Sequence, residues 1–195
     1  MVTREHAPDF TSRLASLKQR GCSLLVTGDV PDEGRMLATR RLLGAPEEPR
    51  RRVLVLNDEH PGHYLPSGVS ADDDTVRVLR PDAGDPTSLR DAVADAVDDL
   101  EPDRGYHPSE LRVGVPCFGE FHATDAYADI RETLDHLAEV FLETKGMGHC
   151  TLDAPSDDHL VTDIADGFDA QVELRATHRI EQRWHLDEAS GWFEL

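Results

Sequence analysis

The chain has 195 residues, with 39 acidic and 20 basic side chains and a net charge of −19 at pH 7. This length suits one domain with a full core, so we expect a single domain over residues 1–195. Such an acidic balance disfavours nucleic acid as a partner, because phosphate contacts need a basic face. No stretch has the roughly 20 apolar residues that span a bilayer, and the start lacks the apolar core of a signal peptide. We therefore expect a cytoplasmic protein without a membrane partner.

Apolar spacing and turn residues predict helices and strands that alternate along most of the chain. In chain order they are a helix over 9–20, a strand over 22–28, a helix over 33–44, a loop over 45–52, a strand over 53–56, a polar loop over 57–74, a strand over 75–79, a helix over 86–100, a strand over 111–115, a helix over 123–146 capped by Thr124, a strand over 148–154 and a short helix over 156–167 capped by Ser156. The end, 169–195, alternates polar and apolar residues as strands with one exposed face do. The sequence therefore predicts an α/β fold with a mostly parallel sheet, flanking helices and antiparallel C-terminal strands.

The stretch LLVTGDVPDEGRM, residues 24–36, has the outline of a phosphate-binding turn between a strand and a helix. A phosphate loop has four residues between two glycines, then Lys, then Ser or Thr. Here five residues separate Gly28 and Gly34, Arg35 replaces the Lys, and Met36 replaces the hydroxyl. Three acidic residues inside the turn add negative charge, so only Arg35 and the helix N-terminus favour an anion. A plain strand–turn–helix remains the alternative interpretation.

Four segments in order resemble the RecA-like ATPases, and among them the KaiC-like branch. They are CSLLVTGDVPDEGRMLATRRLL (22–43), RRVLVLNDE (51–59), LRVGVPC (111–117) and FDAQVELRATHRIEQRWHLDEASGWFEL (168–195). The resemblance implies a RecA-like sheet of the P-loop NTPase type. It also implies a nucleotide site at Gly28, Gly34 and Arg35, and an acidic catalytic pair at Asp58 and Glu59.

The residues that ATP hydrolysis needs are missing from these segments. Besides the phosphate-loop Lys and hydroxyl, the Asp that the family places after the third of these strands is replaced by Pro116, which is followed by Cys117. A proline side chain offers no metal ligand, so Asp58 and Glu59 are a vestigial pair in this interpretation. We therefore expect a fold that is retained without ATP hydrolysis, and ATP as at most a weak ligand.

Two other clusters carry chemistry-bearing side chains. Asp58, His60 and His63 follow a strand within six residues, and carboxylate with imidazole can bind zinc or another divalent ion. Further on, His149, Cys150, Asp153 and His159 lie near a later strand end, where a Cys/His nucleophilic site would need them to converge. The alternative for the first cluster is a turn at Pro61 and Gly62 whose histidines are simply solvated.

The remaining features indicate packing and solvent adaptation. Cys22, Cys117 and Cys150 are far apart and odd in number, so we expect buried small side chains rather than disulfides. Trp184, Trp192 and Phe193 alternate with polar residues, which favours core or edge packing. The chain has only two lysines and many Asp residues, a composition similar to that of proteins from salt-loving archaea. In such organisms concentrated salt screens the acidic charges.

Three functions stay open from the sequence. The first is a non-catalytic RecA/KaiC-like domain that regulates or binds another protein, or self-associates. The second is a weak nucleotide-binding protein with little turnover. The third is a metal-dependent enzyme that uses the loop over 58–63.

Overall fold

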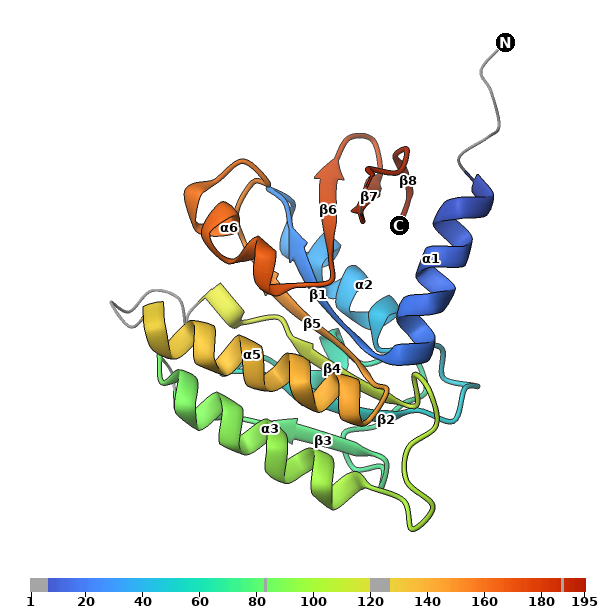
Figure 1. Ribbon diagram of the computed structural model, residues 1–195, viewed down its shortest axis with the longest axis vertical. Coiled ribbons are helices and arrows are strands. Elements are labelled where there is room, and N and C mark those ends of the chain that lie inside the picture. The colour runs from blue at the N-terminus through green and yellow to red at the C-terminus, as the bar shows by residue number, and fades with distance from the viewer. Residues whose placement is uncertain (1–6, 83, 120–126, 187) are drawn as a thin grey trace.

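Within the residues that the structure describes, 7–82, 84–119, 127–186 and 188–195, eight strands form one sheet in the order β3-β2-β4-β5-β1-β6-β7-β8. The structure is a computed structural model, and Figure 1 shows this sheet with helices on both faces. The pairs from β3 to β6 are all parallel, whereas β6–β7 and β7–β8 are antiparallel. The predicted α/β sheet with antiparallel C-terminal strands is therefore confirmed.

The strands are β1 (Cys22–Thr27), β2 (Arg51–Val55), β3 (Val76–Leu79), β4 (Leu111–Val115), β5 (Met147–Leu152), β6 (Ala170–Ala176), β7 (Ile180–His185) and β8 (Phe193–Glu194). The helices are α1 (Ala7–Arg20), α2 (Asp32–Leu42), α3 (Pro86–Leu100), α5 (Tyr127–Glu143) and α6 (His159–Ile164), with short 3-10 helices η1 (Pro61–His63) and η2 (Ala165–Gly167). No helix of the described ranges is long and apolar enough to cross a membrane.

Most predicted ends lie within three residues of these bounds, and three of the differences bear on the fold. The strand predicted over 53–56 begins earlier, at Arg51, because the Arg52 guanidinium is satisfied by backbone carbonyls inside the protein. The predicted cap Ser156 is wrong, because the side chain of Asp158 accepts from the Leu160 N–H and caps α6. Helix α5 covers Tyr127–Glu143 of the predicted range, and Thr124 lies outside the described residues.

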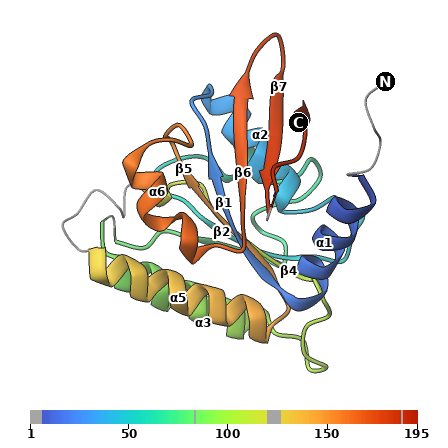
Figure 2. The same cartoon turned by 45° about the horizontal axis from the view of Figure 1, so that its top comes forward.

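Alternation along each strand divides the core between the two faces of the sheet. One face carries α3, α5 and α6, with α3 and α5 side by side (Figures 1 and 2). The other face carries α1 and α2 and packs Leu17 and Ala38 against β1, β6 and β7. Helix α5 approaches β5 closely because Gly148 has no side chain: a Cβ there would lie 2.0 Å from the Phe141 ring.

Candidate functional site

The turn after β1 lies where the connections leave the sheet in opposite directions. Helix α2 follows β1 and packs on one face, while α6 follows the neighbouring strand β5 and packs on the other. The loops after these two strands therefore separate at the carboxyl edge of the sheet. Ligands of open α/β sheets bind in the crevice that such a separation creates. This places the turn over 28–35 at the position expected for a ligand site.

Backbone groups of the turn are paired with the protein itself. The Gly28 N–H donates to the Ala154 carbonyl at 2.8 Å, and the Gly34 N–H donates to the Pro31 carbonyl at 2.8 Å. The Arg35 N–H also points to the Pro31 carbonyl, at 3.4 Å. Val30 is only 4% exposed and belongs to the core on the α1–α2 face. The turn is therefore folded inward, and these three amides already have acceptors.

Arg35 is held by the protein. Its Nη1 donates to the Val30 carbonyl at 2.7 Å and contacts the Asp153 carboxylate, and its Nη2 contacts the Asp32 carboxylate. The Arg35 side chain is 17% exposed, whereas those of Asp32 and Asp153 are 74% and 63% exposed. Asp153 reaches Arg35 from the end of β5, 118 residues away in sequence, which sequence analysis did not anticipate. An anion would have to displace two carboxylates to reach this guanidinium.

Neighbouring strands fill the space beside the first glycine. Gly28 has φ +137°, and a Cβ there would lie 2.2 Å from the Leu174 carbonyl oxygen of β6. The Thr27 hydroxyl lies 3.0 Å from that of Ser156 and accepts from the Gln171 amide at 2.9 Å. The need for glycine at position 28 therefore has a structural reason that involves no phosphate.

The acidic pair predicted as vestigial catalytic residues lies away from this turn. Asp58 and Glu59 are exposed after β2, and β4 and β5 separate β2 from β1 in the sheet. Glu59 Oε1 accepts from the Tyr64 hydroxyl at 3.2 Å, and its backbone carbonyl accepts from Arg80 at 3.1 Å. Burial, followed by the Glu59 charge, raises the pKa of Tyr64. This tyrosine is therefore a hydrogen-bond donor to Glu59 at neutral pH.

The loop over 58–63 does not bring its candidate metal ligands into a site. The His60 and His63 rings are tilted with centroids 5.8 Å apart, and His60 Nδ1 accepts from the Gly62 N–H at 3.1 Å. In the part of the chain that the structure describes, no three His, Cys, Asp or Glu side chains form a group that could hold a metal ion. The contacts of the histidine pair instead support a local turn at η1.

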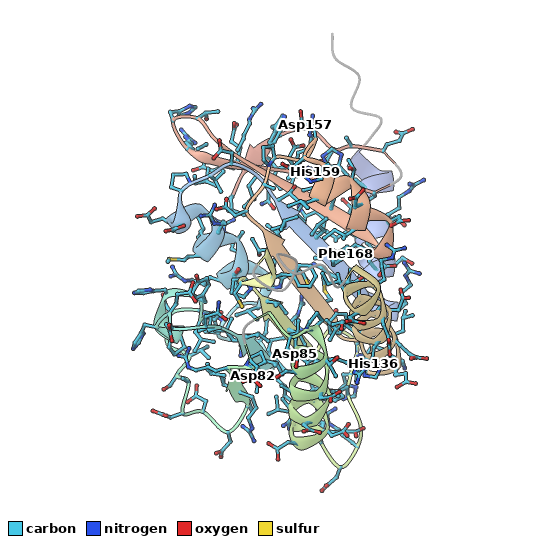
Figure 3. The ribbon with its side chains drawn as sticks, turned by 90° about the vertical axis from the view of Figure 1, so that its left-hand side faces the viewer. Asp82, Asp85, His136, Asp157, His159 and Phe168 are labelled. Atoms are coloured by element: carbon cyan, nitrogen blue, oxygen red, sulfur yellow. The ribbon has the colours of Figure 1, made fainter. Side chains whose placement is uncertain are left out.

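The second cluster is divided between the two faces of β5. Cys150 packs in the core beneath α3 and α5, whereas the ring of His149 lies against Gly114 on the α2 face. Burial, followed by the Arg112 charge, lowers the pKa of His149 to about 3. Asp153 is bound to Arg35, and the 79% exposed side chain of His159 lies with Asp157 at the α6 end of the molecule (Figure 3). These four side chains therefore do not converge on a nucleophilic site.

All three cysteines are buried thiols, as predicted. Pro116 follows the end of β4, and the Cys117 sulfur points to the Val55 carbonyl at 3.6 Å, inside the core. Burial, followed by the charge of Asp169, raises the pKa of Cys22 to about 12. A thiol with such a pKa stays protonated at neutral pH, so Cys22 is not an activated nucleophile.

Together these features define an α/β domain whose turn after β1 is held by contacts with the protein's own backbone and side chains. The profile of a family of unknown function, DUF7504, matches residues 21–85 and 79–174. These matches cover more than half of the chain, so the protein belongs to the DUF7504 family. A comparison with curated proteins gave no match.

Proposed function

We propose that this protein is a non-catalytic RecA/KaiC-like domain that acts as a regulatory or protein-interaction module. The mostly parallel sheet, the strand–turn–helix at its centre and the antiparallel closing strands support the RecA-like relationship. The observation that carries the loss of catalysis is the closure of the turn by Arg35, Asp32 and Asp153. A triphosphate would meet these carboxylates without the Lys and hydroxyl that neutralise it elsewhere.

Its partner in this proposal is another protein or a second copy of the chain, with no role for nucleic acid. Protein–DNA affinity depends on cationic groups that neutralise phosphates. Here most described arginines already contact a carboxylate, among them Arg77, Arg90 and Arg131. The proposed setting is a cytoplasm of high ionic strength, where the remaining acidic charge is screened.

Calorimetric titration with ATP and magnesium, together with a phosphate-release assay, tests the proposal. We expect no saturable heat and no magnesium-dependent release above the level of a heat-denatured sample. A turnover of roughly 1 s⁻¹ or more that Glu59→Gln abolishes would show that the protein is an ATPase.

One variant distinguishes the proposed function from the alternative of weak nucleotide binding. Asp153→Asn removes one carboxylate from Arg35 while retaining a side chain of similar size. If the turn binds nucleotide weakly, this variant should bind ATP more tightly than the wild type. If the turn is closed as proposed, both proteins give the same blank titration. Metal analysis of the purified protein tests the third alternative, a site at Asp58, His60 and His63.

A further inference from the structure

A cavity of about 340 Å³ lies on the α1–α2 face of the sheet, and no residue of the turn over 28–35 lines it. It is bounded by α1, the C-terminal end of α2, the amino ends of β4 and β5, and the strands β7 and β8. Its apolar walls include Phe10, Leu14, Leu42, Met147, Val172 and Trp184. Phe10 and Trp184 meet edge to face with ring centroids 6.3 Å apart, so the aromatic wall is well packed.

Basic side chains outnumber acidic ones at this cavity, whereas acidic side chains outnumber basic ones in the whole protein. Four of the lining side chains are cations, those of Lys18, Arg41, Arg50 and Arg112, and one is a carboxylate, that of Glu48, although the chain as a whole has a net charge of −19. Glu48 is already paired with Arg50 at 2.9 Å. Among the described residues, no carboxylate pairs with the other three cations. Lys18 is also one of only two lysines in the chain.

Arg112 is the buried cation of this group. Its side chain belongs to a residue only 6% exposed, and its Nε donates to the Ser109 carbonyl at 3.1 Å. Its Nη1 reaches the Leu42 carbonyl at 3.3 Å and the Met147 sulfur at 2.8 Å. No hydrogen bond to a described residue uses Nη2, although the guanidinium lines the cavity. A buried cation without a carboxylate is costly, and an anion in the cavity would supply the missing partner.

The partial negative charge at the C-terminal end of α2 does not oppose the binding of an anion in the cavity. Helix C-termini repel anions through their unpaired carbonyls. Here the Leu42 carbonyl accepts from Arg112, and Arg52 donates to the carbonyls of Leu43 at 3.0 Å and Ala45 at 2.8 Å. Burial, followed by the charge of Arg50, lowers the pKa of Arg112 to about 10, which leaves it fully charged at neutral pH. The cavity therefore presents a net positive charge above apolar walls.

We propose that this cavity binds a small amphipathic anion, a carboxylate on an apolar body of medium length. The carboxylate lies by Arg112, Arg41 and Lys18, and the apolar body lies along Phe10 and Trp184. A volume of about 340 Å³ lies at the lower end of the roughly 300–1,000 Å³ range of ligand pockets, which suits a small ligand. Octanoate is one such ligand. The site stands independently of whether the turn after β1 binds nucleotide.

Tryptophan fluorescence gives a direct test, because Trp184 lines the cavity. Trp192 lies outside it, stacked under the guanidinium groups of Arg175 and Arg183, so Trp192→Phe leaves one local reporter. In this background we expect octanoate to change the fluorescence saturably. Octanol has the same chain without the charge and should bind at least tenfold more weakly. Acetate, which has the charge without the chain, should give no saturable change at the same concentrations.

The exposed cations test the charge requirement without disturbing the core. Lys18→Gln with Arg41→Gln should weaken octanoate binding about tenfold, the effect of one lost charge-assisted contact. The matched control Arg77→Gln removes an arginine of β3 that pairs with Asp99 away from the cavity, and should leave the affinity unchanged. Arg112→Gln should abolish binding, and circular dichroism checks its fold. If that variant does not fold, the double variant of Lys18 and Arg41 carries the test.

Three outcomes would overturn the proposal. Octanoate could fail to change the Trp184 signal, octanol could bind as tightly as octanoate, or the double variant could bind octanoate like the control. The second and third would show an apolar pocket that does not recognise an anion.

Discussion

Gly28 offers a quantitative test of why the turn after β1 needs a glycine. In Gly28→Ala the new Cβ would lie 2.2 Å from the Leu174 carbonyl oxygen, at a φ of +137°. A non-glycine residue in that half of the map costs about 1–2 kcal/mol, and forcing an extra methyl into a packed site costs about 1–3 kcal/mol. Leu174 belongs to β6, which is paired on both sides, so its carbonyl cannot withdraw freely. We expect a loss of about 2–5 kcal/mol. For a domain of this size it lowers Tm by about 4–20 °C.

The matched control is Gly191→Ala, because no atom lies within 4 Å of a Cβ at position 191 and its φ is ordinary for any residue. This change should stay within about 0.5 kcal/mol of the wild type. Thermal melting by circular dichroism measures both variants, with and without ATP and magnesium. A Gly28→Ala protein that melts like the control would refute the close approach of β6. A wild-type Tm that rises with ATP would show that Gly28 serves a phosphate site.

Three further changes probe the charge, the packing and the C-terminal strands. Raising KCl from about 0.05 to 2 M should increase Tm steeply by screening acidic repulsion, and a Tm that is flat in circular dichroism would contradict salt adaptation. Gly148→Ala should destabilise the fold by about 1–3 kcal/mol in urea unfolding, because its Cβ would meet the Phe141 ring at 2.0 Å, and Phe141→Leu should recover part of this loss. Burial raises the pKa of Glu173, but hydrogen bonds from Arg183 and His185 outweigh it and lower the pKa overall. The stabilisation of the fold by the ionised Glu173 carboxylate is therefore present above the ordinary carboxyl pKa. It is lost as the pH falls through the lowered pKa of Glu173 in the folded protein. Glu173→Gln should cost about 1–2 kcal/mol at pH 7 and progressively less below about pH 4 in the same unfolding assay.

Local sequence patterns were sufficient to predict those helices and strands whose signals lie within their own residues. Helix α3 was predicted at its observed bounds because its apolar residues share one face, and the structure adds the cap by Asp85 and Pro86 in the first turn. The bounds of β4 were also confirmed. The start of β2 was not, because Arg51 and Arg52 resemble a loop until the carbonyls at the end of α2 are in place.

The candidate sites depended on contacts that are distant in sequence. The turn over 28–35 was identified as a place of interest, but its closure depends on Asp153 at the end of another strand. His149 and Cys150 do not form the hypothesised nucleophilic site for a simpler reason: neighbouring residues of a strand face opposite sides of the sheet. The cationic cavity was missed because its cations come from α1, α2, the loop before β2, and β4. An arginine in the apolar run LRVGV was the one local sign of it.

The two edge strands of the sheet, β3 and β8, limit how copies of the protein can associate. Strand β3 has four residues and β8 only two, and the chain after β7 turns back so that the Ser190 N–H donates to the Trp184 carbonyl. Short margins of this kind offer few free amides and carbonyls to a foreign strand. Self-association by continuing the sheet from one copy to the next is therefore disfavoured. Any ring or filament of this protein would have to be joined through its helices and side chains.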